Sequence, residues 1–476
     1  MSPLALYRLR LRAMSSLFLF NLNGNFFIMK IQVLSHSFAS ASRERNQDMP
    51  KTQVNMNPEL HPFSRPRELT RALNVVKLER LFAKPFVGAL SGHNDGVYAM
   101  AKHTRILNTL LSGSADGELR LWDISSKKTR WNMRHAHSRF VRALSFVHND
   151  HSGSRFVSGS DDGFVHLWDT SASTSNSPIR SFEIGDCVSG LDHHPFDNTF
   201  VTAAGGVVSL WNHDRNTATT RWSRPGLETL THVRFNSADA SILGTCGLDR
   251  TVGLLDLRMD SPLARVTLTM KSNSLCWNPM EPLNFAVANE DSNAYLFDMR
   301  RLDMPLNVLE GHTSALLDLD FSPTGEELVS GSYDHTLRIF STKHGRSRDV
   351  YHTKRMQKVF SVRWSMDNQF IFSSSDDGSI RYWRSQASSR SSALPSRQSE
   401  ALNYGAALKA KYSQIPEVKR ISTHRHIPKP ISSAQREKRI ILESQKRKEE
   451  NRRKHSAPGA VPHLGLRSKI VELKLN

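Results

Sequence analysis

A short pattern recurs seven times along the middle of the chain, and it constrains the fold more than any other feature. Each copy is a run of small polar residues, usually an acidic residue, then alternating residues that end in Trp, Phe or Leu. The end positions are residues 122, 168, 211, 255, 297, 340 and 383, giving steps of 46, 43, 44, 42, 43 and 43 residues. A period of about 40 to 45 residues is typical of a four-stranded propeller blade. The sequence therefore predicts an all-β, seven-bladed β-propeller.

The local chemistry of the copies agrees with this assignment. Leu119–Trp122 and Val165–Trp168 alternate as strands do, and Asp116-Gly117 and Asp162-Gly163 supply the tight turns that enter them.

The copies resemble WD40 repeats, in which a Gly-His upstream completes a hydrogen-bonded group inside the blade. The resemblance implies structural groups made of His93, Ser112, Asp116 and Trp122; of His137, Ser158, Asp162 and Trp168; and of His312, Ser330 and Asp334. Blades three, four and five lack the Gly-His, blade three has Gly205 in place of the acid, and blade six ends in Phe340. Because a buried polar group without a partner costs a few kcal/mol, we expect these sheets to be held more by packing.

The last blade lacks one strand, because the residues after Trp383 are rich in Ser, Gln and Arg. The segment 86–90, just before the first Gly-His, is a spare strand. Pairing it with the last blade would close the ring and remove an exposed sheet edge. We expect the propeller to span residues 86–385.

The charge is concentrated in the segments that flank the predicted ring. The chain has 64 Lys and Arg against 45 Asp and Glu, a formal charge of +19. Residues 1–85 hold 13 basic and 5 acidic residues, 86–385 hold 31 and 33, and 386–476 hold 20 and 7. A polyanionic partner is therefore expected to contact the flanks.

A helix is predicted over Ser433–Lys454, after Pro428 and Pro430 and before Pro458-Gly459. Its basic residues are candidates for contacts with an RNA backbone, where each neutralised phosphate releases counterions. These candidates are Arg436, Lys438, Arg439, Lys446, Arg447, Lys448, Arg452, Arg453 and Lys454. A solvated helix or a nuclear localisation signal explains the same composition.

A second basic cluster lies inside the ring, in the expected connection between blades six and seven. It consists of Lys343, Arg346, Arg348, Lys354, Arg355 and Lys358. Such a run of charges is often an ordinary solvated surface. This one lies near the blade from which both flanking segments are expected to leave the ring. One continuous basic RNA-binding face is the alternative.

No residue pattern indicates catalysis, a cofactor or a small-molecule substrate. The chain has no phosphate loop, no G-x-S-x-G and no H-E-x-x-H. His193-His194 and His424-Arg-His426 lack a Cys or carboxylate at ligand spacing, so no metal site is predicted. Three Cys favour a reducing compartment, and no stretch approaches the roughly 18 apolar residues of a membrane span. We expect a protein that is not an enzyme and does not bind membranes.

The first 43 residues contain five basic residues and no acidic one, a composition that resembles a transit peptide. An upstream extension of residues 1–28 before an internal start at Met29 explains them equally. Residues 29–85 then form a basic lead-in to the ring.

Segments outside the repeats carry a narrower resemblance, to the suppressor-of-fibrillarin family of WD40 proteins. They are His61–Phe63, Arg71–Asn74, Lys77–Arg80, Phe82–Phe86, Cys276–Glu281, Ala288–Asp291, Val350–Gln357, His424–His426 and Lys454–Ser456. The resemblance implies a nucleolar scaffold of the small-subunit processome. Its expected partners are pre-rRNA, a small nucleolar RNP and other processome proteins, and its expected role is maturation of 18S rRNA in small-subunit biogenesis. Residues 386–476 would be its specific C-terminal region.

The same resemblance brings an alternative function, that of a substrate receptor of a cullin-RING ubiquitin ligase. Such receptors use a W-D-x-R box, whose Arg contacts the ligase adaptor. The nearest matches, Leu255–Arg258 and Phe297–Arg300, lack the Trp. Arg258 and Arg300 are therefore either adaptor contacts or ordinary surface residues after a strand.

Overall fold

A computed structural model describes residues 15–20, 26–31, 57–171, 177–223, 229–259, 261–389, 394–457, 460–463 and 465–475. The chain divides into two compact units, Met1–Arg67 and Glu68–Asn476. In the first unit, β1 (Ser15–Phe20) pairs antiparallel with β2 (Phe26–Ile31), and a short 3-10 helix covers Pro58–Leu60. Apart from these strands, the expected extension over 1–28 lies outside the described residues.

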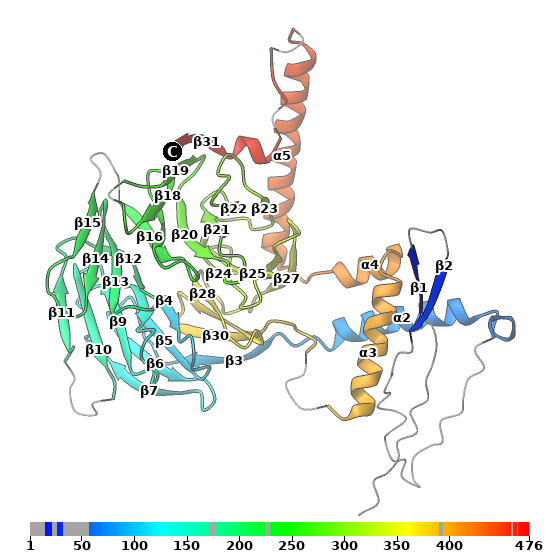
Figure 1. Ribbon diagram of the computed structural model, residues 1–476, viewed down its shortest axis with the longest axis horizontal. Coiled ribbons are helices and arrows are strands. Elements are labelled where there is room, and N and C mark those ends of the chain that lie inside the picture. The colour runs from blue at the N-terminus through cyan, green and yellow to red at the C-terminus, as the bar shows by residue number, and fades with distance from the viewer. Residues whose placement is uncertain are drawn as a thin grey trace, which may run out of the picture. The chain divides into compact units, whose positions relative to one another are not determined.

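Seven antiparallel sheets follow one another in chain order, which confirms the seven-bladed propeller (Figure 1). Blade one is β4 (Val97–Lys102), β5 (Thr109–Ser114), β6 (Leu119–Asp123) and β7 (Lys128–Met133); blade two is β8 (Val141–Phe146), β9 (Arg155–Ser160), β10 (Phe164–Asp169) and β11 (Arg180–Glu183). Blade three is β12 (Val188–His193), β13 (Thr199–Ala204), β14 (Val207–Asn212) and β15 (Thr220–Ser223); blade four is β16 (Leu230–Phe235), β17 (Ile242–Gly247), β18 (Thr251–Asp256) and β19 (Ala264–Leu268).

The remaining blades have the same order of strands. Blade five is β20 (Ser272–Trp277), β21 (Asn284–Asn289), β22 (Ala294–Asp298) and β23 (Asn307–Leu309); blade six is β24 (Leu316–Phe321), β25 (Glu327–Ser332), β26 (Leu337–Ser341) and β27 (Ser347–Tyr351). Blade seven is β28 (Val359–Trp364), β29 (Phe370–Ser375), β30 (Ser379–Arg384) and β3 (Phe86–Ser91).

The ring closes through β3, which pairs antiparallel with β30 from Phe86↔Trp383 to Ser91↔Ser379 (Figure 1). This confirms the expected pairing of 86–90 with the last blade. A strand from the start of the domain thus covers the edge of its final sheet, and the ring leaves no open edge at this point.

Apolar side chains between neighbouring sheets form the core. Between blades one and two, for example, Leu111 and Leu121 pack with Phe156 and Trp168. Burial of each such side chain contributes about 1.5–3 kcal/mol. The repeat ends therefore recur because each third strand must place a large side chain between two sheets.

Each blade has its first strand at the channel and its fourth at the rim, because first strands of successive blades pack on each other. Strand alternation sends two sets of loops to opposite ends of the ring. We call one end the connection face; it holds the links between blades and the turns between second and third strands. The other end, the hairpin face, holds the turns between first and second and between third and fourth strands.

The second unit also contains helices, which lie to one side of the ring (Figure 1). They are α2 (Ser64–Leu81, which begins before the unit boundary), α3 (Ser396–Lys411), α4 (Pro416–Thr423) and α5 (Lys429–Lys454), followed by a 3-10 turn, Arg467–Lys469. The predicted helix 433–454 exists but begins four residues earlier, at Lys429. Pro430 is tolerated in its first turn because the N–H groups there have no partner in the helix. Among the described residues, no helix is both long and apolar enough to cross a membrane.

A final strand, β31 (Val471–Leu475), was not expected from the sequence. It pairs antiparallel with β19 and becomes a fifth strand at the rim of blade four. Ile470, just before it, is buried in the core shared by blades four and five. The basic C-terminal region is thus partly integrated into the propeller.

Candidate interaction surfaces

The structure brings the residues named for blades two and six into hydrogen-bonded groups. In blade two, His137 Nδ1 lies 3.1 Å from Asp162, His137 Nε2 lies 2.7 Å from Ser158 Oγ, and Trp168 Nε1 donates to Ser158 Oγ at 2.9 Å. In blade six the matching distances are 2.8 Å for His312 to Asp334 and 2.7 Å for His312 to Ser330. These groups tie the connection face to the blades.

Blade one differs from the expectation in its acid. Ser112 Oγ lies 2.6 Å from His93 Nε2, but His93 Nδ1 lies 3.0 Å from Glu118, and the proposed Asp116 makes no contact with it. Glu118 also pairs with Arg120 at 2.8 Å. The inclusion of Asp116 was wrong, because the longer Glu118 side chain reaches the same nitrogen from two residues further on.

Blades without the Gly-His contain other polar links in addition to packing. In blade three Trp211 Nε1 donates to Thr202 at 3.0 Å, and in blade five Asn289 Nδ2 donates to the carbonyl of Met270 at 2.8 Å. Neither bond needs a histidine.

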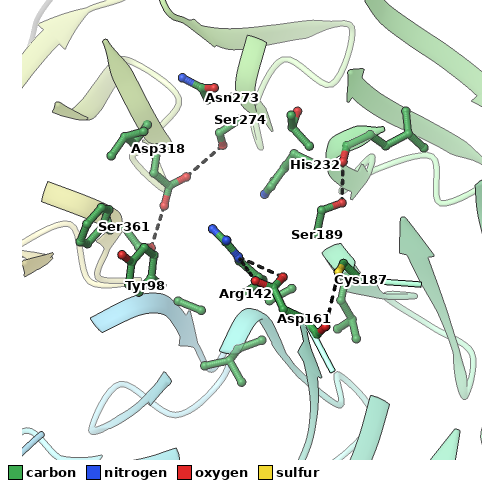
Figure 2. Close-up of a pocket in the computed structure, with 18 of the residues that line it drawn as sticks. Tyr98, Arg142, Asp161, Cys187, Ser189, His232, Asn273, Ser274, Asp318 and Ser361 are labelled. Atoms are coloured by element: carbon green, nitrogen blue, oxygen red, sulfur yellow. Dashed lines mark hydrogen bonds and ion pairs between the residues drawn. The ribbon is translucent and has the colours of Figure 1, made fainter. Parts of the chain in front are cut away.

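Polar and charged side chains of the inner strands link neighbouring blades around the central channel (Figure 2). Asp318 accepts from Arg363 Nη1 at 2.6 Å, from Ser361 at 2.7 Å and from Ser274 at 3.0 Å. These bonds join blades five, six and seven. Burial raises the pKa of the Asp318 carboxyl, but the charge of Arg363 and the hydrogen bond from Ser361 oppose burial, and the pKa lies below its usual value.

The first half of α5 is fixed to the connection face of blades five and six. Gln435 Nε2 donates to the carbonyl of Gly311 at 2.5 Å, and Lys438 contacts Ser292 Oγ and the carbonyl oxygens of Asp291 and His312. Lys438 was among the RNA-contact candidates, but its ammonium is partly buried against the ring. Lys438 thus contacts the ring, and we do not include it among the exposed candidates for an RNA phosphate.

The second half of α5 carries most of the remaining candidates on an exposed surface. Arg436, Arg439, Lys446, Arg447, Lys448, Arg452 and Lys454 are exposed and Arg453 is partly so. Arg439 pairs with Glu443 on the next turn at 2.8 Å. The last turns remain dense in positive charge.

The second basic cluster is not one surface. Lys343 and Arg346 precede β27, on the hairpin face, whereas Lys354, Arg355 and Lys358 follow it, on the connection face. A five-residue strand separates the two sets by about 16 Å. The basic residues offered as an alternative continuous face are thus divided between the two ends of the ring.

Arg348 lies within β27 and is paired. Its Nε lies 2.9 Å from Glu327, and its Nη2 donates to the carbonyl of Ser385 at 2.6 Å. The neighbouring Asp349 pairs with Arg80 of α2 at 3.1 Å. Arg348 therefore holds the segment that follows β30, and its guanidinium is not free to bind RNA.

Arg258 and Arg300 occupy equivalent positions on the hairpin faces of blades four and five. In each, the backbone N–H two residues after the strand-end Asp donates to that Asp at 2.9 Å, and the guanidinium pairs with the same carboxylate. Both side chains are about two-thirds exposed, at 70% and 65%. Exposed apolar side chains accompany them on this face: Met259, Leu263, Met280, Leu283, Met304 and Leu306.

The histidine pairs lie apart from each other. His193 Nε2 lies 3.2 Å from His213, and burial lowers the pKa of His193 to about 3. His426 stacks on His352 with ring centroids 5.5 Å apart. Within the described ranges, no group of three or more His, Cys, Asp or Glu could hold a metal ion.

Comparison with known protein families gives two matches. The WD domain, G-beta repeat, matches residues 84–123, 129–169, 303–341 and 349–384, and the Sof1-like domain matches residues 385–471. The repeats matched are those of blades one, two, six and seven, so the irregular blades three to five are the ones that lack a match. The Sof1-like match covers the helices α3 to α5 and reaches the start of β31.

Curated relatives extend the likeness over nearly the whole chain. Protein SOF1 of Saccharomyces cerevisiae is 43% identical over 469 residues, which cover 93% of this chain and 94% of that protein. DDB1- and CUL4-associated factor 13 of Xenopus laevis is 43% identical over 434 residues (91% and 97%), and that of Homo sapiens is 42% identical over 445 residues (93% and 99%). The chain belongs to the Sof1-like family of WD40 proteins, which includes these relatives.

Proposed function

We propose that this protein is a non-enzymatic scaffold of the small-subunit processome and its small nucleolar RNP, required for processing of pre-rRNA to 18S rRNA. The observation that carries the proposal is the divided structure of α5. Its first half is fixed to blades five and six by Gln435 and Lys438, and its second half presents a dense row of exposed cations. A rigid ring thereby holds a basic helix in a defined position for an RNA backbone.

The relationship to Protein SOF1 supports the assignment of nucleus and nucleolus as the place of action. Partners on this proposal are pre-rRNA and other processome proteins. The ring supplies protein-binding surfaces, and the RNA is bound by α5 and by the exposed Lys354, Arg355 and Lys358 of the same connection face. The exposed Lys343 and Arg346, on the hairpin face, form a separate contact with RNA.

A pair of full-length charge variants tests the proposal. Neutralising Lys446, Arg447 and Lys448 to Gln should weaken binding of a labelled RNA hairpin and reduce the salt slope by about two to three, since each lost phosphate contact removes roughly 0.7–0.9. The matched control neutralises Lys128, Arg130 and Arg134, which are exposed on and beside the rim strand of blade one. In cells, the first variant should accumulate 18S precursors and the control should not. An unchanged salt slope for the α5 variant contradicts the proposal.

A second function, substrate receptor of a cullin-RING ubiquitin ligase, is favoured by a separate observation. Arg258 and Arg300 repeat one geometry on neighbouring blades, among exposed methionines and leucines of the hairpin face. Exposed apolar patches with arginines are typical of protein-binding surfaces. The names of the vertebrate relatives point to DDB1 and CUL4 as the adaptor and cullin.

Charge reversal separates the two functions. The double variant Arg258→Glu with Arg300→Glu should lose co-purification of the adaptor and retain association with pre-ribosomal particles. Arg215→Glu, exposed on the hairpin face of blade three, is the control. Retention of the adaptor by the double variant rejects the receptor function and leaves the scaffold function standing.

A further inference from the structure

The hydroxyl of Ser456 caps the C-terminal end of α5. The helix ends at Lys454, and His455 follows as its cap residue. Ser456 Oγ donates to the carbonyl oxygen of Arg452 at 2.6 Å, and the Ser456 backbone N–H donates to the carbonyl oxygen of Arg453 at 3.4 Å. The last carbonyl groups of a helix have no partner within the helix, so this hydroxyl supplies one of the missing donors.

Four residues with basic side chains directly precede Ser456. They are Arg452, Arg453, Lys454 and His455, and no other Ser or Thr of the chain follows an unbroken run of four such residues. Protein kinases that select basic substrates bind Arg and Lys two and three positions before the acceptor hydroxyl through carboxylates of their own substrate groove. Arg453 and Lys454 occupy these two positions.

The end of α5 is free of the ring, which matters because a kinase binds its substrate in an extended conformation. The last link of the helix to the rest of the chain is the ion pair of Glu449 with Lys469 at 2.6 Å. Beyond it, residues 450–457 form no side-chain hydrogen bond or ion pair with the ring in the described part of the chain. Ser456 is partly exposed and its neighbours on both sides are exposed. Opening the last turn therefore breaks few bonds.

A phosphate on Ser456 would act on the basic half of α5. Residues 446–456 hold six Lys and Arg against Glu449 and Glu450. A phosphoserine adds about −1.5 to −2 charges, which is close to half of this excess. It would lie beside the negative end of the helix dipole, where a negative charge destabilises the helix. The esterified oxygen also has no proton, so the cap bond to Arg452 is lost.

We infer that Ser456 is a phosphorylation site for a protein kinase that selects basic substrates, and that its phosphate weakens the RNA contact of α5. The Ser456 oxygen forms a bond to the γ-phosphorus of ATP, and the bond from that phosphorus to the bridging oxygen of the leaving ADP breaks. The hydroxyl proton passes to a base of the kinase. The effect on RNA rests on the proposed function, whereas the modification itself does not.

Phosphorylation of the full-length protein tests the site. The protein is incubated with ATP and the cAMP-dependent kinase, which selects basic substrates, and mass spectrometry follows each modified residue with time. Ser456 should be modified much faster than Ser468. Ser468 is the matched control, because it is exposed and its hydroxyl donates to a backbone carbonyl at 2.9 Å, but only one Arg precedes it. A Ser456 that stays unmodified, or reacts no faster than Ser468, overturns the inference.

Two readouts on the phosphorylated protein measure the effect. Hydrogen exchange over residues 449–456 should become faster, and this readout involves no RNA. The affinity for the labelled RNA hairpin should fall at least about fivefold, and the salt slope should fall by about one to two, because the phosphate competes for one or two contacts worth roughly 0.7–0.9 each. Ser456→Ala treated with the kinase should show neither change. Unchanged exchange in the phosphorylated protein overturns the loss of the helix cap.

The charge variant of Lys446, Arg447 and Lys448 separates failure of this inference from failure of the proposed function. If that variant weakens RNA binding and phosphorylation of Ser456 does not, the regulatory effect is overturned and the RNA contact stands. If neither change affects RNA binding, the RNA contact fails and the regulatory effect fails with it. The modification of Ser456 is then decided by the mass spectrum alone.

Discussion

The ammonium of Lys438 lies 3.3 Å from the carbonyl oxygen of Asp291, so a residue of the C-terminal helix completes a turn of blade five. It also reaches the carbonyl of His312, whose ring belongs to the hydrogen-bonded group of blade six. Burial lowers the pKa of Lys438, and the acids Asp291 and Glu310 oppose this shift. One partly buried cation thus connects the tail to two blades.

Replacing Lys438 by Met should release the first half of α5 from the ring. The carbonyl oxygens of Asp291 and His312 would lose their donor, at a cost of about 1–3 kcal/mol. Hydrogen exchange should become faster over residues 429–440. Lys448→Met, exposed near the end of the same helix, should leave that exchange unchanged. Equal protection in the two variants would show that Lys438 does not hold the helix.

Glu118→Gln should destabilise blade one more than Asp116→Asn does. The first change leaves Arg120 without its ion-pair partner and His93 with a weaker acceptor, at a cost of about 1–3 kcal/mol. At position 116, burial and the nearby Asp95 and Glu118 raise the pKa of the carboxyl, so removing its charge relieves repulsion. Denaturant midpoints of the two variants provide the comparison. A larger loss for Asp116→Asn would restore the original assignment.

The sequence could predict the group in blade two but not in blade one, for a physical reason. Asp162 follows Ser158 by four residues, and Asp116 follows Ser112 by the same spacing. In blade one, two acids follow Ser112 at short spacing: Asp116 after four residues and Glu118 after six. Only the three-dimensional course of the turn decides which carboxylate reaches the ring nitrogen.

The ring itself was predictable because every blade repeats the same alternation and turn. The course of the tail was not, because it depends on single tertiary contacts. Neither the pairing of β31 with β19 nor the contact of Lys438 leaves a periodic signal. Lys343 and Lys358 are close in sequence, which suggested a single basic cluster. The strand β27 between them places them on opposite faces of the ring.

Acidification should destabilise the propeller between pH 6.5 and about 4. Burial lowers the folded-state pKa of His93 to about 4 and those of His193 and His232 to about 3, below the unfolded value of about 6.5. The unfolded chain therefore binds protons first as the pH falls. The stabilisation is fully present above pH 6.5 and decreases below it, with a slope of up to about 1.4 kcal/mol per pH unit for each histidine.

Unfolding midpoints measured from pH 7.5 to 5 check this expectation. His232→Gln should make the unfolding midpoint less dependent on pH. The change removes a histidine that stays neutral in the folded state but binds a proton in the unfolded chain. His344→Gln, exposed before β27, should leave the profile unchanged. A midpoint that is constant over this range would contradict the role of buried neutral histidines.

Ile470→Asn should weaken the attachment of β31 to blade four. Ile470 is 7% exposed and packs in the core of blades four and five, whereas Leu473, on the strand itself, is 63% exposed. The first change buries a polar amide in an apolar cluster and should cost about 2–4 kcal/mol, while Leu473→Asn should cost less than about 0.5 kcal/mol. Thermal unfolding reports the global effect, and hydrogen exchange over β19 reports whether its edge becomes open. If the two variants behave alike in both measurements, β31 does not protect the rim of blade four.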